Sequence, residues 1–185
     1  MTDKKMIRTW GGVFFSPLDP HPEDIRPEDI AHALSLMCRA NGHFSSFYSV
    51  GQHCLACEEE AHASGLSREI RLACLLHDAS EAYISDITRP VKLGLPEYLV
   101  IEKRLQELIY RRFGIDPQDA GIMAEVSRID DTMLYHEFLA LGGCALFDKA
   151  PPKVTQPDFS FRPFAQVEKQ YLDTLTFLYN TEDNI

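Results

Sequence analysis

Apolar residues recur every three or four positions in several stretches of this 185-residue chain, and glycine or proline separates one stretch from the next. The stripe Ile122, Val126, Ile129 and Met133 steps by four, three and four. This interval matches the 3.6-residue repeat of an α-helix and not the alternation of a half-buried strand. The pattern therefore predicts an all-α fold in which each helix buries one face against its neighbours.

The same breaks divide the chain into about six helices within a single domain, residues 1–185. We expect the helices over residues 29–38, 45–64, 68–76, 97–113, 117–141 and 164–179. Asp29 is a plausible N-cap for the first helix, and Pro117 suits the first turn of the fifth. We expect residues 1–28 to form a short extended N-terminal arm or hairpin, because Trp10–Phe15 has the composition of a short strand or hairpin. Residues 149–163, which contain four prolines, predict a loop that could serve as a lid.

Composition and charge exclude several functional classes. Hydrophobic residues make up 45% of the chain and charged residues 25%, as in an ordinary soluble globular protein. The formal net charge of −10 argues against binding to a nucleic-acid polymer. No apolar stretch approaches the ~18 residues of a membrane span, and the first residues lack the apolar core of a signal peptide. The odd number of cysteines, five, suggests reduced thiols, so we expect a cytoplasmic protein with no membrane partner.

Histidines and carboxylates at a few positions predict a metal site. His77 and Asp78 are adjacent near the end of an apolar helix, where a charged pair is costly unless it is paired or binds a metal. His53 lies on the preceding predicted helix and Asp130 on a later one. Two imidazoles and two carboxylates are a mixed set suited to one divalent ion, such as Mn, Co, Fe or Ni, with Zn or Mg as alternatives.

His53, His77-Asp78 and Asp130, in this order, resemble the H…HD…D signature of the HD-domain metal-dependent phosphohydrolases. The blocks CRANGH at 38–43, FYSVGQH at 47–53 and HDASEAY at 77–83 are similar to those of the bacterial 5'-deoxynucleotidases and the phage dATP triphosphohydrolases. The resemblance covers roughly residues 10–137. It implies an HD-domain helical bundle, one divalent metal ion, a small-molecule nucleotide substrate and a homo-oligomer, dimer or higher.

The resemblance also implies roles for single residues. His53, His77, Asp78 and Asp130 match the metal ligands. Glu81 matches the acidic residue that handles the nucleophilic water, and Asp86 matches one that positions this water or protonates the leaving group. Arg39 and Lys92 match cations that contact the substrate phosphate. His43 precedes the second predicted helix, where it either lines the mouth of the site or only satisfies backbone groups.

The fourth ligand has one alternative. The family spacing of Asp, three residues, Leu, two residues and Glu fits Asp130, Leu134 and Glu137. Ile129 stands where the family usually has alanine, which leaves Asp131 as the competing aspartate.

These assignments lead to three hypotheses of function. The first is hydrolysis of (deoxy)nucleoside 5'-monophosphates to nucleoside and phosphate through a metal-bound water. The second is a dNTP triphosphohydrolase that releases triphosphate. The third is a catalytically silent nucleotide-binding regulator. A sequence in which a metal ligand or Glu81 was replaced would favour this hypothesis. The chain lacks the HDxxED motif of the ppGpp hydrolases and the GYP motif of the cyclic-dinucleotide phosphodiesterases.

Two further patterns have structural interpretations. Cys54 and Cys57 have CxxC spacing but no second pair, so we expect two small buried thiols rather than a zinc ribbon. The run Glu58-Glu59-Glu60 predicts a solvated helix face.

Overall fold

The computed structural model describes residues 5–180, and most of them are helical. The longer helices are α1 (Pro27–Leu36), α2 (Val50–Ala63), α3 (Arg68–Leu76), α6 (Pro96–Arg112), α7 (Ala120–Glu137) and α8 (Phe164–Asn180). Two single-turn helices, α4 (Glu81–Ile84) and α5 (Arg89–Lys92), connect α3 to α6. A π-helical turn, Phe138–Gly142, extends α7. The expected all-α fold is confirmed.

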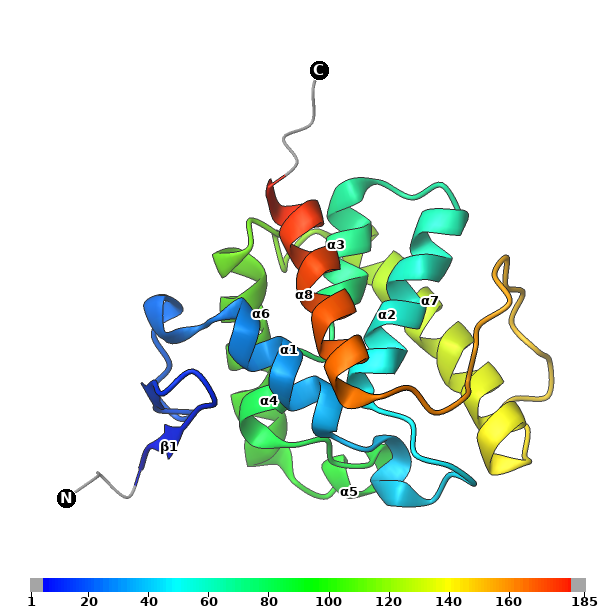
Figure 1. The fold of residues 1–185 in the computed structure, drawn as a ribbon, viewed down its shortest axis with the longest axis horizontal. Coiled ribbons are helices and arrows are strands. Elements are labelled where there is room, and N and C mark those ends of the chain that lie inside the picture. Colours follow the sequence, from blue (N-terminus) through cyan, green and yellow to red (C-terminus); the bar gives the residue numbers. More distant parts are fainter. Residues whose placement is uncertain (1–4, 181–185) are drawn as a thin grey trace.

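Helix α2 lies at the centre of the fold. It packs against α1, α3, α7 and α8, and Figure 1 shows it enclosed among them. Eleven of its fourteen residues are buried, as expected of a helix that other helices surround. Gly51 allows the close approach, because a Cβ atom there would lie 3.2 Å from the Leu34 carbonyl and 3.1 Å from Val167 Cγ1. The central position of α2 brings His53 into the interior.

Three predicted helix starts were wrong. Helix α2 begins at Val50 rather than at residue 45 or 46, because Ser49 and Gln52 form a capping box that fixes the start. Helix α1 begins at Pro27, so Asp29 is not its N-cap; its carboxylate accepts a 2.5 Å hydrogen bond from the Gly11 N–H. Helix α7 begins at Ala120 with Asp119 as its cap, rather than at Pro117.

The N-terminal arm forms a hairpin against the helices. Strands β1 (Ile7–Arg8) and β2 (Phe14–Phe15) are antiparallel, with Ile7 opposite Phe15 and Arg8 opposite Phe14. The Trp10-Gly11-Gly12 segment, expected in a strand, is the turn between them, and Gly12 has the positive φ of +83° that the turn requires. Phe15 stacks on Tyr83 of α4, with ring centroids 4.1 Å apart. The hairpin therefore packs against the turn that carries Glu81.

Residues 144–163 form an irregular strap that runs from the end of α7 to the start of α8 (Figure 1). His136 Nε2 lies 3.0 Å from the Pro151 carbonyl oxygen. The Glu60 carboxylate accepts hydrogen bonds from the N–H groups of Val154 and Thr155 and from the Thr155 hydroxyl, at 2.6–2.9 Å. Glu60 is 1% exposed, so the expectation of a solvated glutamate run was wrong.

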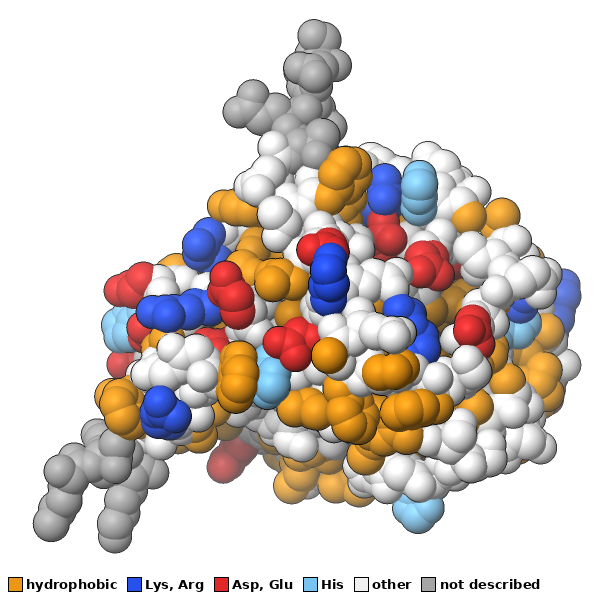
Figure 2. Space-filling model, in the orientation of Figure 1, with side chains coloured by type: hydrophobic (Ala, Val, Ile, Leu, Met, Phe, Trp, Pro, Cys, Tyr) orange, Lys and Arg blue, Asp and Glu red, His pale blue; other side chains and the backbone are white. Residues whose placement is uncertain are grey.

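The face shown in Figure 2 carries acidic and basic side chains side by side in its upper half, while hydrophobic side chains gather in its lower half, below the first turn of α8. Phe161 and Phe164, which flank the start of α8, are both exposed and pack edge to face. Among residues 5–180, no helix combines the length and the hydropathy needed to cross a bilayer. The homo-oligomer remains a prediction.

Candidate metal centre

Three helices bring the four predicted metal ligands to one place. His53 lies in the first turns of α2, which is central, and Asp130 lies midway along α7, which packs on α2. His77 is the C-cap of α3, and Asp78 follows it in the turn toward α4. Because α3 ends here, the adjacent His77 and Asp78 are not constrained to diverge by 100° as on a continuous helix.

Four side-chain atoms face one another at this crossing: Nε2 of His53, Nε2 of His77, Oδ2 of Asp78 and Oδ1 of Asp130. Five of the six distances among them lie between 3.1 and 3.7 Å. A metal ion with bonds of about 2.1 Å holds neighbouring ligand atoms about 3.0 to 3.4 Å apart. The geometry therefore fits four ligands of one ion.

Both imidazoles are oriented by their second nitrogen. His77 Nδ1 lies 2.7 Å from the Cys74 carbonyl oxygen, which can only accept, so Nδ1 carries the proton. His53 Nδ1 lies 2.6 Å from Glu137 Oε1. In a neutral imidazole with its proton held on Nδ1, each Nε2 is free to present a lone pair to a metal ion at the shared centre. Glu137 is 0% exposed and was not among the predicted site residues. The spacing Asp130, Leu134 and Glu137, which was used to choose Asp130, already contained it.

The electrostatics of the centre favour a cation. Burial alone lowers the pKa of His77, but the Asp78 carboxylate and the hydrogen bond to Asp130 outweigh it, so the pKa lies well above its usual value. Burial raises the pKa of Asp130, yet its hydrogen bonds to His53 and His77 hold that pKa well below the usual range. The carboxylates therefore favour positive charge at this centre, either as protons on the imidazoles or as a metal ion that displaces those protons.

Two buried thiols lie close behind the histidines. Cys57 is within 4.8 Å of ligand atoms of His53 and His77, and Cys54 is within 4.8 Å of those of His77 and Asp78. The residues present could thus hold a metal ion in more than one grouping. Burial raises the pKa of the Cys54 thiol, which makes it a poorer ligand than the neighbouring nitrogen and carboxylate oxygen atoms. Both cysteines are buried and free, as expected.

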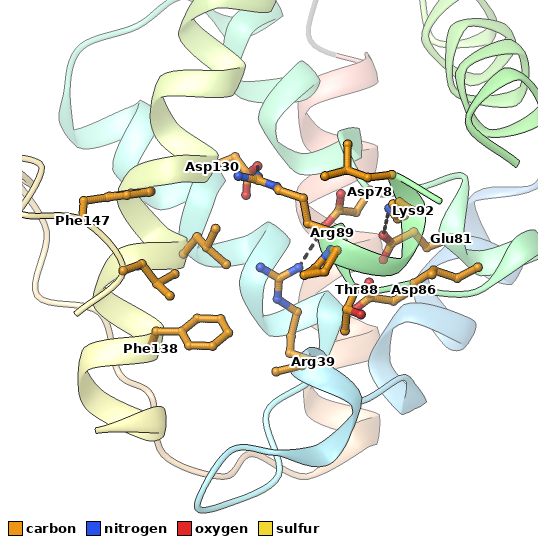
Figure 3. Close-up of a pocket in the computed structure, with 16 residues that line it drawn as sticks. Arg39, Asp78, Glu81, Asp86, Thr88, Arg89, Lys92, Asp130, Phe138 and Phe147 are labelled. Atoms are coloured by element: carbon orange, nitrogen blue, oxygen red, sulfur yellow. Dashed lines mark hydrogen bonds and ion pairs between the residues drawn. The ribbon is translucent and has the colours of Figure 1, made fainter. Parts of the chain in front are cut away.

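A cavity of about 640 Å³ opens beside this centre (Figure 3). One part is lined by charged side chains from residue 39, from the segment 78–92 and from α7, and the other by apolar side chains of α7, its π-helical turn and the strap. The charged lining is Arg39, Asp78, Glu81, Asp86, Arg89, Lys92 and Asp130, and the apolar lining includes Leu134, Phe138, Leu146 and Phe147. This volume suits a ligand of the size of a nucleotide.

Glu81 is 3% exposed and lies on the cavity wall. Its Oε1 accepts from Lys92 Nζ at 3.3 Å, while its Oε2 is buried with no partner within the described residues. Burial, together with the negative charges of Asp78 and Asp86, raises its pKa well above the usual value. A carboxylate on a cavity wall whose pKa is raised is a stronger base than an exposed one and can accept a proton from a bound water.

Asp86 and Lys92 also reach this wall. Burial raises the pKa of Asp86, and the Asp78 carboxylate adds to the shift, although Arg39 opposes it. Lys92 Nζ donates to Glu102 Oε1 at 2.5 Å as well as to Glu81. Lys92 is therefore held in place by two carboxylates.

Arg39 enters the cavity from a strained turn. Ala40 and Asn41, which follow it, have φ values of 51° and 50°, in the left-handed region that L-residues rarely occupy. Such strain at non-glycine residues costs about 1–2 kcal/mol each and is typical of functional sites. Arg39 donates to Asp78 Oδ2 at 3.4 Å and to Glu137 Oε2 at 3.3 Å, so its guanidinium is fixed beside the metal centre.

The remaining predicted residue is not brought into the site. His43 is exposed and is not part of the cavity lining. Of the two competing aspartates, Asp130 faces the histidines, while Asp131 pairs with Arg89 at 3.6 Å. Arg89, which lines the cavity, was not among the predicted site residues, although it stands three positions before Lys92 in the sequence.

Comparison with known proteins adds relatives but no function. No family model matches the chain. The chain is 38% identical over 111 residues to a protein of Escherichia coli K12 called uncharacterized protein YfdR, a match that covers 60% of each chain. It is 43% identical over 119 residues to an uncharacterized protein of Rhodobacter capsulatus, covering 60% of this chain and 61% of the relative. The chain thus spans about 60% of the length of the curated relatives it matches.

Proposed function

We propose that this protein is an HD-domain metal-dependent phosphohydrolase that hydrolyses (deoxy)nucleoside 5'-monophosphates to the nucleoside and phosphate. The observation that carries the proposal is that His53 and His77 lie 3.1–3.7 Å from Asp78 and Asp130 and from each other, beside a cavity. Asp78 and Asp130 line this cavity together with two further acids and three cations. Separate ion pairs do not require both imidazole Nε2 atoms, 3.1 Å apart, to face the same carboxylates. A shared metal ion requires this arrangement, because all of its ligand atoms must point toward one centre.

A divalent ion bound there would neutralise a phosphate oxygen and lower the pKa of a water molecule. The protein's own residues supply the rest of the reaction. Glu81, whose carboxylate lies on the cavity wall, is suited to take a proton from the attacking water. Asp86, whose pKa is raised, can return a proton to the leaving oxygen of the nucleoside.

Fixed positive charge favours a phosphate group in the charged part of the cavity. Arg39 and Lys92 each lie between two carboxylates, so they hold their positions before the substrate arrives. Positive groups that need no rearrangement stabilise the negative charge on the phosphoryl oxygens of the transition state. This is the role that the family resemblance implies for both residues.

The apolar part of the cavity suits the nucleoside. Phe138 and Phe147 lie on the opposite side of the cavity from Glu81 and Lys92 (Figure 3). Phe147 also stacks on Tyr135, which keeps its ring in place. Aromatic side chains at this position could pack on a base while the phosphate occupies the charged end.

The proposal is tested by product analysis. The protein is stripped of metal, and Mn²⁺, Co²⁺, Mg²⁺ or Zn²⁺ is added back with a panel of (d)NMPs and dNTPs. We expect orthophosphate and nucleoside from the monophosphates in the presence of metal and none in its absence. Triphosphate from dNTPs, with the monophosphates inert, would instead identify a triphosphohydrolase. Metal binding with no product from any member would contradict nucleotide hydrolysis.

A further inference from the structure

Three cations line the cavity, and their acidic partners hold them with unequal strength. The Arg39 and Lys92 side chains are 11% and 19% exposed, and each lies within 3.4 Å of two carboxylates. The Arg89 side chain is 65% exposed. Its Nη2 lies 3.6 Å from Asp131 Oδ1 and 3.9 Å from Asp130 Oδ2, which are longer than hydrogen bonds. Arg89 is thus the loosely held cation of the cavity.

We propose that Arg89 is a phosphate-binding residue of this site, which turns from Asp130 and Asp131 to the phosphate of the ligand. The inference rests on the proposed function in that it takes the ligand to be a phosphate ester. Arg89 is the first residue of α5 and stands three positions before Lys92, on the same side of the helical turn. Figure 3 shows its side chain reaching across the cavity toward Asp130.

The exchange of partners costs little and gains a better one. An exposed ion pair without hydrogen bonds contributes little because water screens it. A phosphate offers a guanidinium two parallel hydrogen bonds and up to two negative charges. In addition, Asp130 Oδ1 faces His53 and His77. A cation held between these residues would partly neutralise the Asp130 carboxylate and so weaken the attraction between Asp130 and Arg89.

The test compares Arg89→Ala and Arg89→Lys with Arg128→Ala as the matched control. Arg128 is a half-exposed arginine of α7 that pairs with Glu125 and does not line the cavity. Binding of inorganic phosphate and of dAMP is measured by calorimetry, on both the metal-free and the Mn²⁺-loaded protein. KM and kcat for dAMP are measured in parallel, and bound manganese is determined for each variant.

We expect Arg89→Ala to weaken phosphate and dAMP binding about tenfold or more, which is the loss typical of a charge-assisted pair. KM should rise by a similar factor while kcat changes far less. Arg89→Lys should retain part of the affinity, because lysine keeps the positive charge but lacks the two parallel N–H donors of the guanidinium. Arg128→Ala should bind and turn over like the wild type.

The outcomes separate the two proposals. Binding and KM within about twofold of the wild type in Arg89→Ala would overturn the role of Arg89 alone. Loss of manganese from Arg89→Ala would overturn it too, since Arg89 would then act by holding Asp130. A wild-type protein that binds dAMP without hydrolysing it contradicts the hydrolysis but still tests Arg89 by affinity. A wild-type protein that binds neither phosphate nor dAMP overturns both.

Discussion

Replacing Glu137 with glutamine should weaken metal binding without touching a metal ligand. Glu137 is fully buried; its Oε1 lies 2.6 Å from His53 Nδ1 and its Oε2 accepts from Arg39 Nη2 at 3.3 Å. The change keeps the shape of the side chain and removes the charge that makes His53 a stronger, fixed ligand. Loss of such a partner typically lowers metal affinity 10- to 100-fold, or about 1.4–2.7 kcal/mol.

The assay is calorimetric titration of metal-stripped protein with Mn²⁺, with urea unfolding of each variant as a parallel measurement. Glu58→Gln is the control, because Glu58 is also a buried carboxylate of the interior, paired with Arg71 at 2.6 Å. Both changes should lower the free energy of unfolding by about 1–3 kcal/mol. Only Glu137→Gln should weaken manganese binding. Equal manganese affinity in Glu137→Gln and the wild type would refute the role given to this carboxylate.

Three more substitutions test separate parts of the account. Glu81→Gln should keep metal affinity within a few-fold and lower kcat at least ~100-fold in the dAMP assay, and retained turnover would contradict proton transfer at this residue. Burial alone raises the pKa of Glu60, but hydrogen bonds from Thr155 and Val154 outweigh it and lower that pKa. In urea unfolding, the wild type should therefore be more stable than Glu60→Gln above the unfolded pKa of about 4.3, and this difference should vanish as the pH falls through the lower folded pKa. A stability difference that does not change with pH would contradict this. Gly51→Ala should destabilise the fold by about 1–3 kcal/mol, measured the same way, because its Cβ would meet the Leu34 carbonyl at 3.2 Å; unchanged stability would mean that α1 can shift freely.

Local pattern was enough to predict the helices that carry the proposed metal ligands. The stripe of Ile122, Val126, Ile129 and Met133 is buried along α7, as its spacing indicated. Ser67 caps α3 by accepting from the Ile70 N–H, so that start agrees with the sequence. Such features depend on residues within one or two turns of each other, which is the range that sequence spacing reports.

The features that were missed depend on contacts between distant segments. Glu60 appeared to belong to a solvated run, but its partners lie 94 and 95 positions later, in the strap. Glu137 meets His53 from 84 positions away. Similarly, the left-handed turn after Arg39 places Ala40 at a φ of 51°, which the local preference of alanine opposes, whereas Asn41 tolerates this region.

The family resemblance supplied the roles of the candidate site residues, and the fold brings most of them together. His43 is the exception, because it remains exposed outside the cavity lining. The resemblance gave no role to Arg89, although this residue stands three positions before Lys92; its side chain approaches Asp130 and Asp131 of α7 from α5.

The most direct test of the central claim is the metal content of two neighbouring variants, Asp130→Asn and Asp131→Asn, measured by mass spectrometry after loading with Mn²⁺ and dialysis. Asp130 Oδ1 lies 3.2 Å from His53 Nε2, whereas Asp131 pairs with Arg89. We expect one manganese per chain in the wild type and in Asp131→Asn, and strong loss of manganese in Asp130→Asn. Full retention of manganese by Asp130→Asn, or its loss from Asp131→Asn alone, would contradict a metal centre formed by His53, His77, Asp78 and Asp130.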